Sequence, residues 1–307
     1  VANVRSAVEH GVQVMENVSV QSILIEDGKV TGVQARCEMT GEEKEYRSPC
    51  VVNASMADPA SFLAMVGISL PLVFTRLDFV VVDKRVSRKV IHRFPSNPQS
   101  RQGIIPIDSW SAVRKTTREV SKPDNPAVST EEIRQLLEEA RRIIPGVKEA
   151  TAMRAFTVTQ AFFEMNRPSI PRKTCDDSLI IDHGLRDGVA GLYTVTGAML
   201  STYRRAAKMA ADAVCRKLGI SVPCTTHREH LPEVADVLPR DSQNEAEKNS
   251  PDTSSAGDEI VCQCKGITRR EIENICETWW SMGMAGLQHS TGVGTGPCQG
   301  GRCVVKM

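Results

Sequence analysis

Several features are scarce in this sequence of 307 residues, and each shortage argues against a class of protein. Aromatic residues make up only 4% of the chain, and the formal net charge is +1. Nucleic-acid binding commonly relies on a basic surface and on aromatic side chains that stack on bases, so we expect no nucleic-acid partner. No apolar run approaches the roughly 18 residues that a membrane-spanning helix needs. The first residues, VANVRSAVEHGVQV, lack the basic and apolar segments of a signal peptide, so we expect a cytoplasmic protein.

Ten cysteines are present, and in a reducing compartment cysteines serve metals or redox chemistry more often than disulfides. Four of them form two close pairs, Cys262 with Cys264 and Cys298 with Cys303. The pattern is C-x-C, a spacer of 33 residues, and C-x4-C. Four thiolates suit zinc or an iron–sulfur cluster, but structural zinc sites usually have C-x2-C to C-x4-C pairs. The spacing therefore favours a cluster, and leaves a zinc site or four unrelated thiols as alternatives.

The remainder of the chain predicts a mixture of strands and helices. A helix is expected over 129–145, where Ser129 and Glu132 form a capping box, and another over 200–218. The segment 224–258 is rich in Pro, Ser, Asp and Glu, which is typical of a linker. Strand-like runs occur at 13–25, 29–36, 45–53 and within 72–120, with turn residues between them. The first three runs indicate a small antiparallel meander.

The end of the chain resembles a known cluster-binding domain. The stretches VCQC and GPCQGGRC are similar to the [2Fe–2S] domain of the bacterioferritin-associated-ferredoxin type, over residues 259–307. The glycines of TGVGTGPCQGG would let backbone N–H groups approach the sulfides. Cys276 lies outside the pattern, in the middle of an expected helix. The resemblance implies four ligands to a [2Fe–2S] cluster: Cys262, Cys264, Cys298 and Cys303.

A second resemblance concerns GLYTVTGAMLSTYRR, at 191–205. We expect a buried strand that runs into Gly197-Ala198 and a helix that begins near Leu200. This pattern lets a ligand approach the backbone and the helix N-terminus. The alternative is that the small residues serve only to pack the helix against the strand. The segment resembles the strand–helix unit that closes the flavin site of FAD-dependent glycerol-3-phosphate dehydrogenases, which reads G-G-K-L-T-T-Y-R. The stretches HGVQVMENVSVQSILIEDGKVTGVQA, VVNAS and RPSIPRKTCDDSLIIDHGLRDG resemble other parts of the same family.

The resemblance implies which residues serve FAD and the substrate. No catalytic residue is assigned, and the candidates are Arg154, His183 and Arg204. His183 could accept a proton, and a structural histidine at a strand end is the alternative. The residues implied to bind the cofactor are Val18, Asn53, Ala54, Ser55, Gly197, Ala198, Met199, Leu200, Ser201 and Thr202.

The expected fold is α/β with antiparallel parts (α+β). The resemblance implies a partial FAD-binding domain of the D-amino-acid-oxidase/glycerol-3-phosphate-dehydrogenase type, an antiparallel-sheet substrate domain and a small helical [2Fe–2S] domain. We expect parts of the FAD-binding domain at 1–65 and 166–220, the substrate domain at 66–165, a linker at 221–258 and the cluster domain at 259–307.

Three departures from the family pattern bear on function. The sequence has no G-x-G-x-x-G, the fingerprint that holds the FAD pyrophosphate, so we expect a truncated chain or a separate N-terminal FAD-binding chain. Met199 stands where the family has lysine, and Gln160 where it has arginine. Because arginine is the usual bidentate partner of a phosphate, both substitutions weaken the case for glycerol 3-phosphate itself.

The leading interpretation is an FAD-linked dehydrogenase subunit that oxidises a secondary alcohol, sn-glycerol 3-phosphate to dihydroxyacetone phosphate or a related small-molecule substrate. Electrons would leave the flavin through the [2Fe–2S] cluster to redox partner subunits. The resemblance implies that these partners form a membrane-anchored, quinone-reducing complex, with this chain peripheral at the inner membrane. One alternative is a 2-hydroxy acid or amino acid oxidoreductase of the same fold. The other is a non-catalytic electron-transfer subunit of a split flavoprotein.

Overall fold

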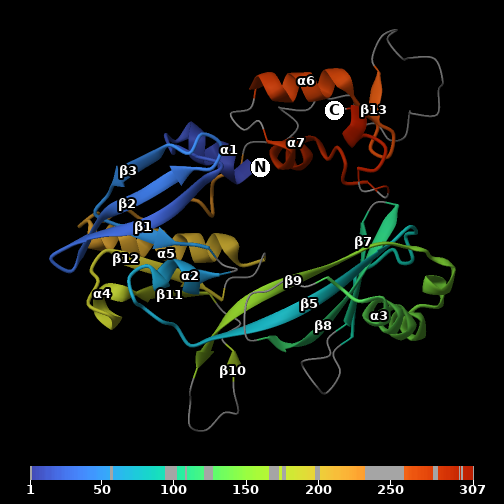
Figure 1. The fold of residues 1–307 in the computed structure, drawn as a ribbon, viewed down its shortest axis with the longest axis horizontal. Helices are drawn as coiled ribbons and strands as arrows, with labels where there is room; N and C mark the ends of the chain where they lie inside the picture. Colours follow the sequence, from blue (N-terminus) through green and yellow to red (C-terminus); the bar gives the residue numbers. More distant parts are fainter. Residues whose placement is uncertain are drawn as a thin grey trace. The chain divides into compact units, whose positions relative to one another are not determined.

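The computed structural model divides the chain into two compact units, coloured along the sequence in Figure 1. One unit spans Asn17–Thr225, and the other combines Val1–Glu16 with Thr226–Met307. In the part of the chain that the structure describes, no helix is long and apolar enough to cross a membrane. The described residues are all of 1–307 except 1, 56–57, 94–101, 108, 121–126, 166–172, 175–177, 198–200, 232–258, 279–282, 297, 299 and 307.

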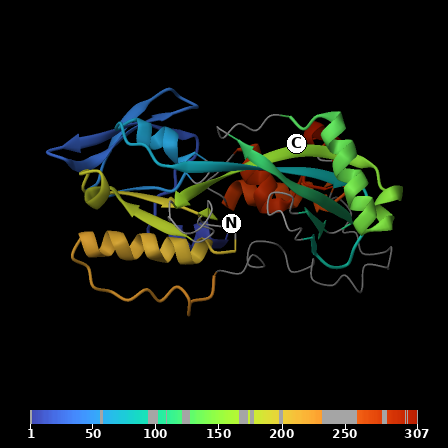
Figure 2. The same cartoon turned by 90° about the horizontal axis from the view of Figure 1, so that it is seen from below.

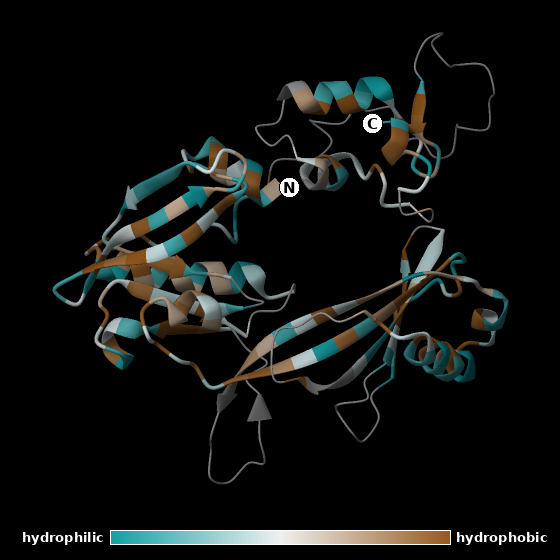
Figure 3. Cartoon of the chain, in the orientation of Figure 1, coloured by the Kyte–Doolittle hydropathy of each residue, from teal (hydrophilic) through white to brown (hydrophobic). Residues whose placement is uncertain are grey.

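A three-stranded antiparallel sheet opens the larger unit, in the order β1-β2-β3. Asp27 and Gly28 have φ angles of +49° and +70°, the left-handed conformation that a two-residue hairpin turn requires. Hydrophobic and polar bands alternate along β1 and β2 (Figure 3), as expected for strands with one buried face. This sheet confirms the predicted meander. Its strands are β1 (Val18–Glu26), β2 (Lys29–Cys37) and β3 (Glu43–Arg47).

The predicted third strand of the meander, 45–53, is wrong because it is two strands in two sheets. β3 ends at Arg47, Pro49 follows, and β4 (Val51–Asn53) joins a second sheet with the order β11-β12-β4. Proline has no N–H to donate to a strand ladder, so it separates the two segments. β4 pairs in parallel with β12, which provides the parallel element expected of an α/β fold.

Helix α5 covers one face of this second sheet, as the view from below shows (Figure 2). All residues of β12 are buried. Ala206 and Ala210 of α5 pack against Val195 of β12, and their small side chains let the helix lie close to the strand. These elements are β11 (Leu179–Asp182), β12 (Leu192–Thr196) and α5 (Tyr203–Lys217), with the short helices α2 (Pro59–Ala64) and α4 (His183–Arg186) beside them.

A six-stranded sheet forms the other half of the larger unit, in the order β10-β9-β5-β8-β7-β6. Every neighbouring pair is antiparallel, as expected for the substrate domain. The strands are β5 (Leu72–Val82), β6 (Ile91–Arg93), β7 (Gln102–Ile107), β8 (Trp110–Val120), β9 (Ala152–Met165) and β10 (Lys173–Thr174).

Helix α3 (Thr130–Ile143) covers one face of the six-stranded sheet, and the 3₁₀ helix η2 (Pro145–Glu149) follows it. The predicted capping box is confirmed, because the Ser129 side chain accepts from the Glu132 N–H and the Glu132 side chain accepts from the Ser129 N–H. Alternate residues of β5 point towards α3, so Val80 and Val82 pack with Leu136 in one hydrophobic core.

The same face of β5 buries an ion pair. Arg76 and Asp78 are each 2% exposed, and Arg76 Nε lies 2.6 Å from Asp78 Oδ1. Arg76 Nη2 also lies 3.4 Å from Glu132 Oε2, so the ion pair connects the sheet to the first turn of α3.

The cysteine-rich module of the smaller unit contains short strands and helices. Thr268 and Glu271 form the expected capping box, with the Thr268 N–H 2.7 Å from Glu271 Oε2. Val261 and Val293 form a small core with Cys262 and Cys303. The elements of this unit are α1 (Ala2–Glu9), β13 (Ile260–Cys262), β14 (Ile267–Thr268), α6 (Arg269–Thr278), α7 (Met284–Thr291) and the 3₁₀ helix η5 (Val304–Lys306).

Candidate functional sites: a strand-end site, an open sheet face and a cysteine cluster

Two parallel strands of the larger unit end side by side, and most residues expected to bind a cofactor follow these ends. β4 and β12 pair from Val51 opposite Leu192 to Asn53 opposite Thr194. Ligands of open α/β sheets bind at the carboxyl ends of parallel strands, where the backbone turns away and leaves a crevice. This pairing brings the ends of both strands to one edge of the sheet, where Ala54 follows β4 and Gly197 follows β12.

Asn53 shapes the loop after β4. Its side chain is 2% exposed, and its Nδ2 donates to the Pro59 carbonyl at 3.1 Å. Its Oδ1 accepts from the Ser55 N–H at 3.2 Å and from the Ser55 hydroxyl at 2.6 Å. Because both polar atoms of the Asn53 side chain are used within the loop, Asn53 fixes the conformation of Ala54 and Ser55, which are both exposed.

The end of β12 has a buried polar atom that the sequence alone did not single out. Thr196 is 2% exposed, and its Oγ1 has no hydrogen-bond partner among the described residues. A buried hydroxyl without a partner is costly, so this atom fits a polar ligand group at the strand end. Gly197 follows with φ +73°, a conformation that favours glycine and turns the chain towards α5. A threonine that ends a fully buried strand is the only signal that the sequence offers for this role.

The remaining predicted cofactor residues have different positions. Ser201 is exposed and Thr202 is half-buried, directly before α5. Val18 begins β1, and at the other end of that strand the β1–β2 turn accepts a hydrogen bond at Gly28 O from the N–H of Ala190, just before β12, at 2.8 Å. Val18 therefore lies at the end of β1 away from that junction. The predicted residues Ala198, Met199 and Leu200 lie outside the described residues.

His183 has both ring nitrogens occupied within the protein. It is fully buried, with Nδ1 2.6 Å from Asp187 Oδ2 and Nε2 2.8 Å from Thr194 Oγ1. A general base must reach the proton of the substrate, and His183 could do so only by breaking one of these bonds. The geometry favours the structural alternative, in which His183 connects α4 to β12.

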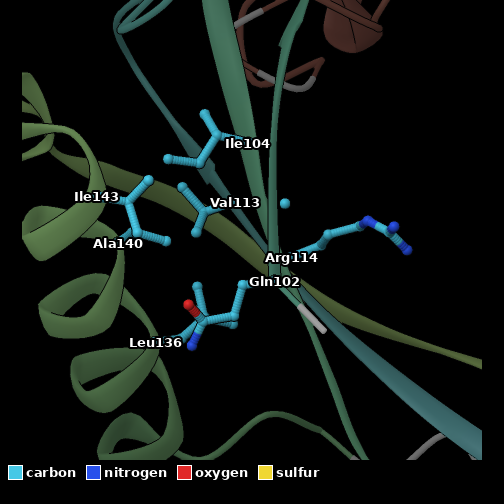
Figure 4. A pocket seen from close by; sticks show the side chains of 8 residues that line it. Gln102, Ile104, Val113, Arg114, Leu136, Ala140 and Ile143 are labelled. Carbon is cyan, nitrogen blue, oxygen red and sulfur yellow. The ribbon is translucent and has the colours of Figure 1, made fainter. Parts of the chain in front are cut away.

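The face of the six-stranded sheet opposite α3 carries a row of side chains that the sequence did not single out. Five directly paired residues cross the sheet from β6 to β9: His92, Gly103, Arg114, Phe79 and Phe156. Phe79 and Phe156 stack with ring centroids 4.9 Å apart, and Arg114 Nη2 lies 3.2 Å from His92 Nδ1. Figure 4 shows the Arg114 side chain leaving the sheet on the side away from α3.

Gly103 has a specific role in this row. A Cβ atom at Gly103 would lie 2.9 Å from Arg114 Nε and 3.3 Å from His92 Nδ1. The glycine therefore leaves the space in which the guanidinium and imidazole groups meet. The meeting of Arg114 with His92 depends on the register of β6, β7 and β8, which a single sequence does not reveal. The sequence indicates only that Arg114 and its neighbour Val113 point to opposite faces of their strand.

The predicted residues Arg154 and Gln160 lie on this same face of β9. Arg154 is exposed, and its Cζ lies 5.5 Å from the centroid of the Phe156 ring. Gln160 is half-buried and pairs with Thr75, so it lies four residues along β9 from Phe156. Arg204 lies apart from this sheet face in sequence, half-buried in the first turn of α5. We call this face, opposite α3, the open face; among its described residues Arg114 and Arg154 carry positive charge and Gln160 is neutral.

A small cavity on the opposite side of the sheet is too small for a substrate. It measures about 10 Å³ and lies between α3 and strands β7 and β8 (Figure 4). Such a volume holds about one water molecule. Gln102 Oε1 is buried nearby and has no hydrogen-bond partner among the described residues, so a water molecule fits there. The cavity is lined by Gln102, Gly103, Ile104, Val113, Arg114, Leu136, Ala140 and Ile143.

The four motif cysteines of the smaller unit lie together. Cys264 Sγ lies 3.4 Å from Cys298 Sγ, and Cys262 and Cys303 are both buried in one small core. Gly296 permits the first contact, because a Cβ atom there would lie 2.4 Å from Cys264 Cβ. The Cys264–Cys298 contact joins the C-x-C motif to the C-x4-C motif.

The local environment changes the thiol pKa values in different directions. Burial raises the pKa of Cys298, but hydrogen bonds from the Cys264 thiol and from the backbone at Arg302 and Gly300 outweigh burial and lower it. For Cys264 a backbone hydrogen bond from Cys298 favours the thiolate, yet burial and the neighbouring sulfurs raise the pKa overall. Burial, together with Cys262, raises the pKa of Cys303.

The arrangement of these thiols bears on which metal group they fit. Among the described residues, no three His, Cys, Asp or Glu side chains converge as ligands of one metal ion. A structural zinc ion requires four converging ligands, whereas each iron of a [2Fe–2S] cluster takes only two protein thiolates. The Cys264–Cys298 contact joins two thiols of a kind that either group would use. Cys276 is half-buried on α6.

Comparison with known proteins agrees with this architecture. The model of the DAO family, FAD dependent oxidoreductase, matches residues 1–213. One relative belongs to the anaerobic glycerol-3-phosphate dehydrogenase of Escherichia coli K12; it is 29% identical over 324 residues, covering 99% of this chain and 60% of the relative. Its counterpart in the anaerobic glycerol-3-phosphate dehydrogenase of Haloferax volcanii is 27% identical, covering 100% of this chain and 57% of the relative. Both relatives are named as single subunits of that enzyme.

The structural comparison points to the same fold. The glycerol-3-phosphate dehydrogenase from Bacillus halodurans, solved in complex with FAD, matches with a TM-score of 0.59 and 21% identity over 73% of this chain and 43% of that one. The chain spans 60% or less of the length of these relatives. The expected fold class is confirmed. Because the family model covers more than half of the sequence, the chain belongs to the DAO family of FAD dependent oxidoreductases.

Proposed function

We propose that this chain is a subunit of an FAD-dependent dehydrogenase that oxidises a secondary alcohol and passes the electrons through a [2Fe–2S] cluster to partner subunits. The observation that carries the proposal is the contact between Cys264 and Cys298, 3.4 Å from sulfur to sulfur, on the same chain as a flavoprotein fold. An oxidase can pass electrons from flavin directly to O₂. A cluster accepts electrons singly, so its presence favours a protein acceptor.

The residues of the chain would bind and orient the reactants. Bound FAD would supply hydride chemistry, and the cluster would supply one-electron transfer. The Thr196 hydroxyl and the backbone of Ala54 and Gly197 are the groups that would contact FAD at the strand ends. Arg114 and Arg154, on the open face of the substrate sheet, would attract an anionic group of the substrate. With both His183 nitrogens occupied, the base that takes the hydroxyl proton is not assigned.

The pyrophosphate of FAD needs further polypeptide under this proposal. The glycine-rich fingerprint holds that group at a helix N-terminus, and the sequence has no G-x-G-x-x-G. We therefore assign the pyrophosphate contacts to polypeptide outside these 307 residues, either on the same gene product or on a separate chain. Ser201 and Thr202 would contribute from the start of α5.

The names of the relatives support glycerol 3-phosphate, oxidised to dihydroxyacetone phosphate, as the first substrate to test. The curated relatives are individual subunits of anaerobic glycerol-3-phosphate dehydrogenases, which also supports an assembly with other polypeptides. We propose that these partners accept the electrons and hold the chain at a membrane, where a quinone would be reduced.

Gln160 favours a second candidate function within the same chemistry. A neutral amide cannot supply the charge with which arginine binds phosphate, so a 2-hydroxy acid or an amino acid is the alternative substrate class. A carboxylate carries less charge than a phosphate and needs fewer cationic partners. Arg154 alone could serve it.

Substrate-driven reduction of the cluster would test the proposal. The complex that contains this chain is purified anaerobically, substrate is added, and the electron paramagnetic resonance signal of the reduced cluster is recorded. We expect glycerol 3-phosphate to produce the signal that dithionite produces, and the matched variant Cys298→Ala to produce none. A signal with a 2-hydroxy acid or amino acid alone would support the second candidate. A cluster that only dithionite reduces, in a complex that contains flavin, would contradict both.

A further inference from the structure

The two faces of the six-stranded sheet differ in how their charges are balanced. On the face that α3 covers, Arg76 Nε lies 2.6 Å from Asp78 Oδ1 and Lys115 Nζ lies 2.6 Å from Glu139 Oε1. On the open face, the residues at 77, 79 and 81 of β5 and the residues paired with them on β8 and β9 include no Asp or Glu. This part of the open face is therefore complementary in charge to an anionic ligand.

His92 holds the Arg114 guanidinium in one place on this face. Arg114 leaves the sheet on the side away from α3 (Figure 4), and its Nη2 lies 3.2 Å from His92 Nδ1. A guanidinium only donates hydrogen bonds, so His92 Nδ1 is the acceptor. The bond uses one of the five N–H donors of Arg114, and the planar fork of the guanidinium matches the two oxygens of a carboxylate.

Gly103 determines the direction in which Arg114 turns. A Cβ atom at Gly103 would lie 2.9 Å from Arg114 Nε and 3.3 Å from His92 Nδ1. The Arg114 side chain therefore passes over the glycine, towards β6. Phe79 is paired with Arg114 on the other side, because β8 lies between β7 and β5.

Phe79 presents an aromatic surface beside Arg114. Its ring stacks on the Phe156 ring, with centroids 4.9 Å apart and planes within 4°. Because β5 lies between β9 and β8, Phe156 covers one face of the Phe79 ring, and the other face is directed towards β8. Leu77 and Val81, the neighbours of Phe79 on this face of β5, are 7% and 2% exposed. The half-buried Phe79 ring therefore stands on a packed support and is still accessible to a ligand.

The spacing of these groups limits the ligand. Directly paired residues have Cβ atoms about 5 Å apart, so a ligand that contacts both Arg114 and Phe79 needs an acid group and a ring only a few bonds apart. Arg154 lies elsewhere, with its Cζ 5.5 Å from the centroid of the Phe156 ring. Arg114 is therefore the cation beside the second face of Phe79.

We propose that the open face binds an acid that carries an aromatic ring, with the carboxylate on Arg114 and the ring against Phe79. This inference rests on the proposed function and narrows its second substrate class to 2-hydroxy acids or amino acids with an aromatic side chain. Phe79 and Phe156 determine the specificity, because aromatic rings gain energy from stacking beyond the area that they bury. His92 is a positioning residue that acts through Arg114.

Equilibrium binding of unreactive acids to the full complex would test this inference. 3-Phenylpropionate and propionate share a carboxylate and lack the hydroxyl or amino group at which oxidation would occur, so calorimetry measures their binding without turnover. We expect 3-phenylpropionate to bind at least about tenfold more tightly than propionate. Phe79→Ala should remove most of this difference and leave propionate binding unchanged. Arg114→Gln should weaken the binding of both acids about tenfold.

Two further variants test the role of His92 and control for the surface. His92→Ala should weaken both acids severalfold, and His92→Asn, whose amide oxygen can accept from Arg114, should restore their binding. Val158→Ala is the matched control, because Val158 lies on the same face of β9, is 39% exposed and should affect neither acid. An asparagine variant as weak as the alanine variant would overturn the positioning role.

The unaltered complex alone can overturn the inference, even if a variant fails to fold. Equal affinity for 3-phenylpropionate and propionate would show that no aromatic ring is recognised. Flavin content and substrate-driven reduction, measured on the same preparation, separate this result from failure of the proposed function. A complex that glycerol 3-phosphate reduces and that binds both acids equally keeps the function and contradicts the inference. A complex that prefers 3-phenylpropionate but is reduced by no substrate supports the binding site and contradicts the proposed reaction.

Discussion

The cysteine module (residues 259–307) and the larger unit (Asn17–Thr225), which we call the flavoprotein body, differ in how their candidate sites are assembled. In the module, four residues in two short motifs hold the whole candidate site, and a single glycine, Gly296, lets the two motifs meet. In the body, the candidate site is assembled from the ends of β4 and β12 and from paired residues on five strands. A soft-metal site needs only a few thiolates at the right distance, whereas a flavin site needs a surface. Single substitutions should therefore abolish the first site and only weaken the second.

Removing one motif cysteine should have the largest effect. We expect Cys298→Ala to reduce the iron content from about two per chain to near zero, because one iron would keep a single protein thiolate. Iron analysis after anaerobic purification measures this, and Cys276→Ala is the matched control within the module. Retention of full iron in Cys298→Ala would show that the site does not depend on this cysteine.

Within the flavoprotein body, loss of the buried Arg76–Asp78 ion pair should change the free energy of unfolding more than any catalytic property. Asp78→Ala leaves Arg76 charged in the interior, next to β8 and α3, and should lower the free energy of unfolding by about 3–5 kcal/mol. Denaturant unfolding measures the change. Glu45→Ala, which removes an exposed partner of Arg47, is the control and should cost at most about 1 kcal/mol. Equal costs would mean that Arg76 finds another partner or water.

The open sheet face should tolerate change better than the module. Arg114→Gln should raise the KM for an anionic substrate roughly tenfold, because one charged hydrogen bond contributes about 1.5 kcal/mol or more. Lys115→Gln is the control, since Lys115 points to the other face and pairs with Glu139 at 2.6 Å. Steady-state kinetics on the purified complex distinguishes the two variants. An equal effect from both would argue against a substrate role for the open face.

The loop contact at Gly296 provides a finer test of the module. Gly296→Ala would put a Cβ atom 2.4 Å from Cys264 Cβ, so the Cys298 loop would have to shift. We expect severalfold faster loss of the visible absorption of the cluster in the presence of a chelator. Gly283→Ala, where a Cβ atom would meet nothing within 4 Å, should leave the rate unchanged.

The smallest expected effect concerns local structure in the body. Ser129→Ala removes the side chain that caps α3 and should cost about 1 kcal/mol of stability, without changing iron content or KM. Thermal unfolding measures it. A change in iron content would mean that the two regions of the chain are coupled in folding.

The sequence predicted the local features of both regions well. Turn residues predicted the β1–β2 hairpin, capping boxes predicted the starts of α3 and α6, and the cysteine spacing predicted the grouped thiols. Each of these depends on residues close in sequence or on a distinctive residue type. The single error in the meander came from reading through Pro49, which separates β3 from β4.

The open sheet face could not be predicted, because it depends on pairings between distant residues. Phe79 meets Arg114 and Phe156 across the strand ladder, and the register of those strands has no signature in a single sequence. Sequence alone leaves the role of His183 open for a similar reason. Its partners Asp187 and Thr194 become evident only when α4 and β12 are placed together.

The central claim is that one chain combines a flavoprotein body with a [2Fe–2S] cluster. The most direct test is to purify the chain anaerobically and to measure iron, inorganic sulfide, zinc and flavin on the same sample, together with its visible spectrum. We predict about two irons and two sulfides per chain, with flavin bands at about 375 and 450 nm once the polypeptide that holds the pyrophosphate is present. Zinc with no inorganic sulfide and no visible colour would contradict the claim.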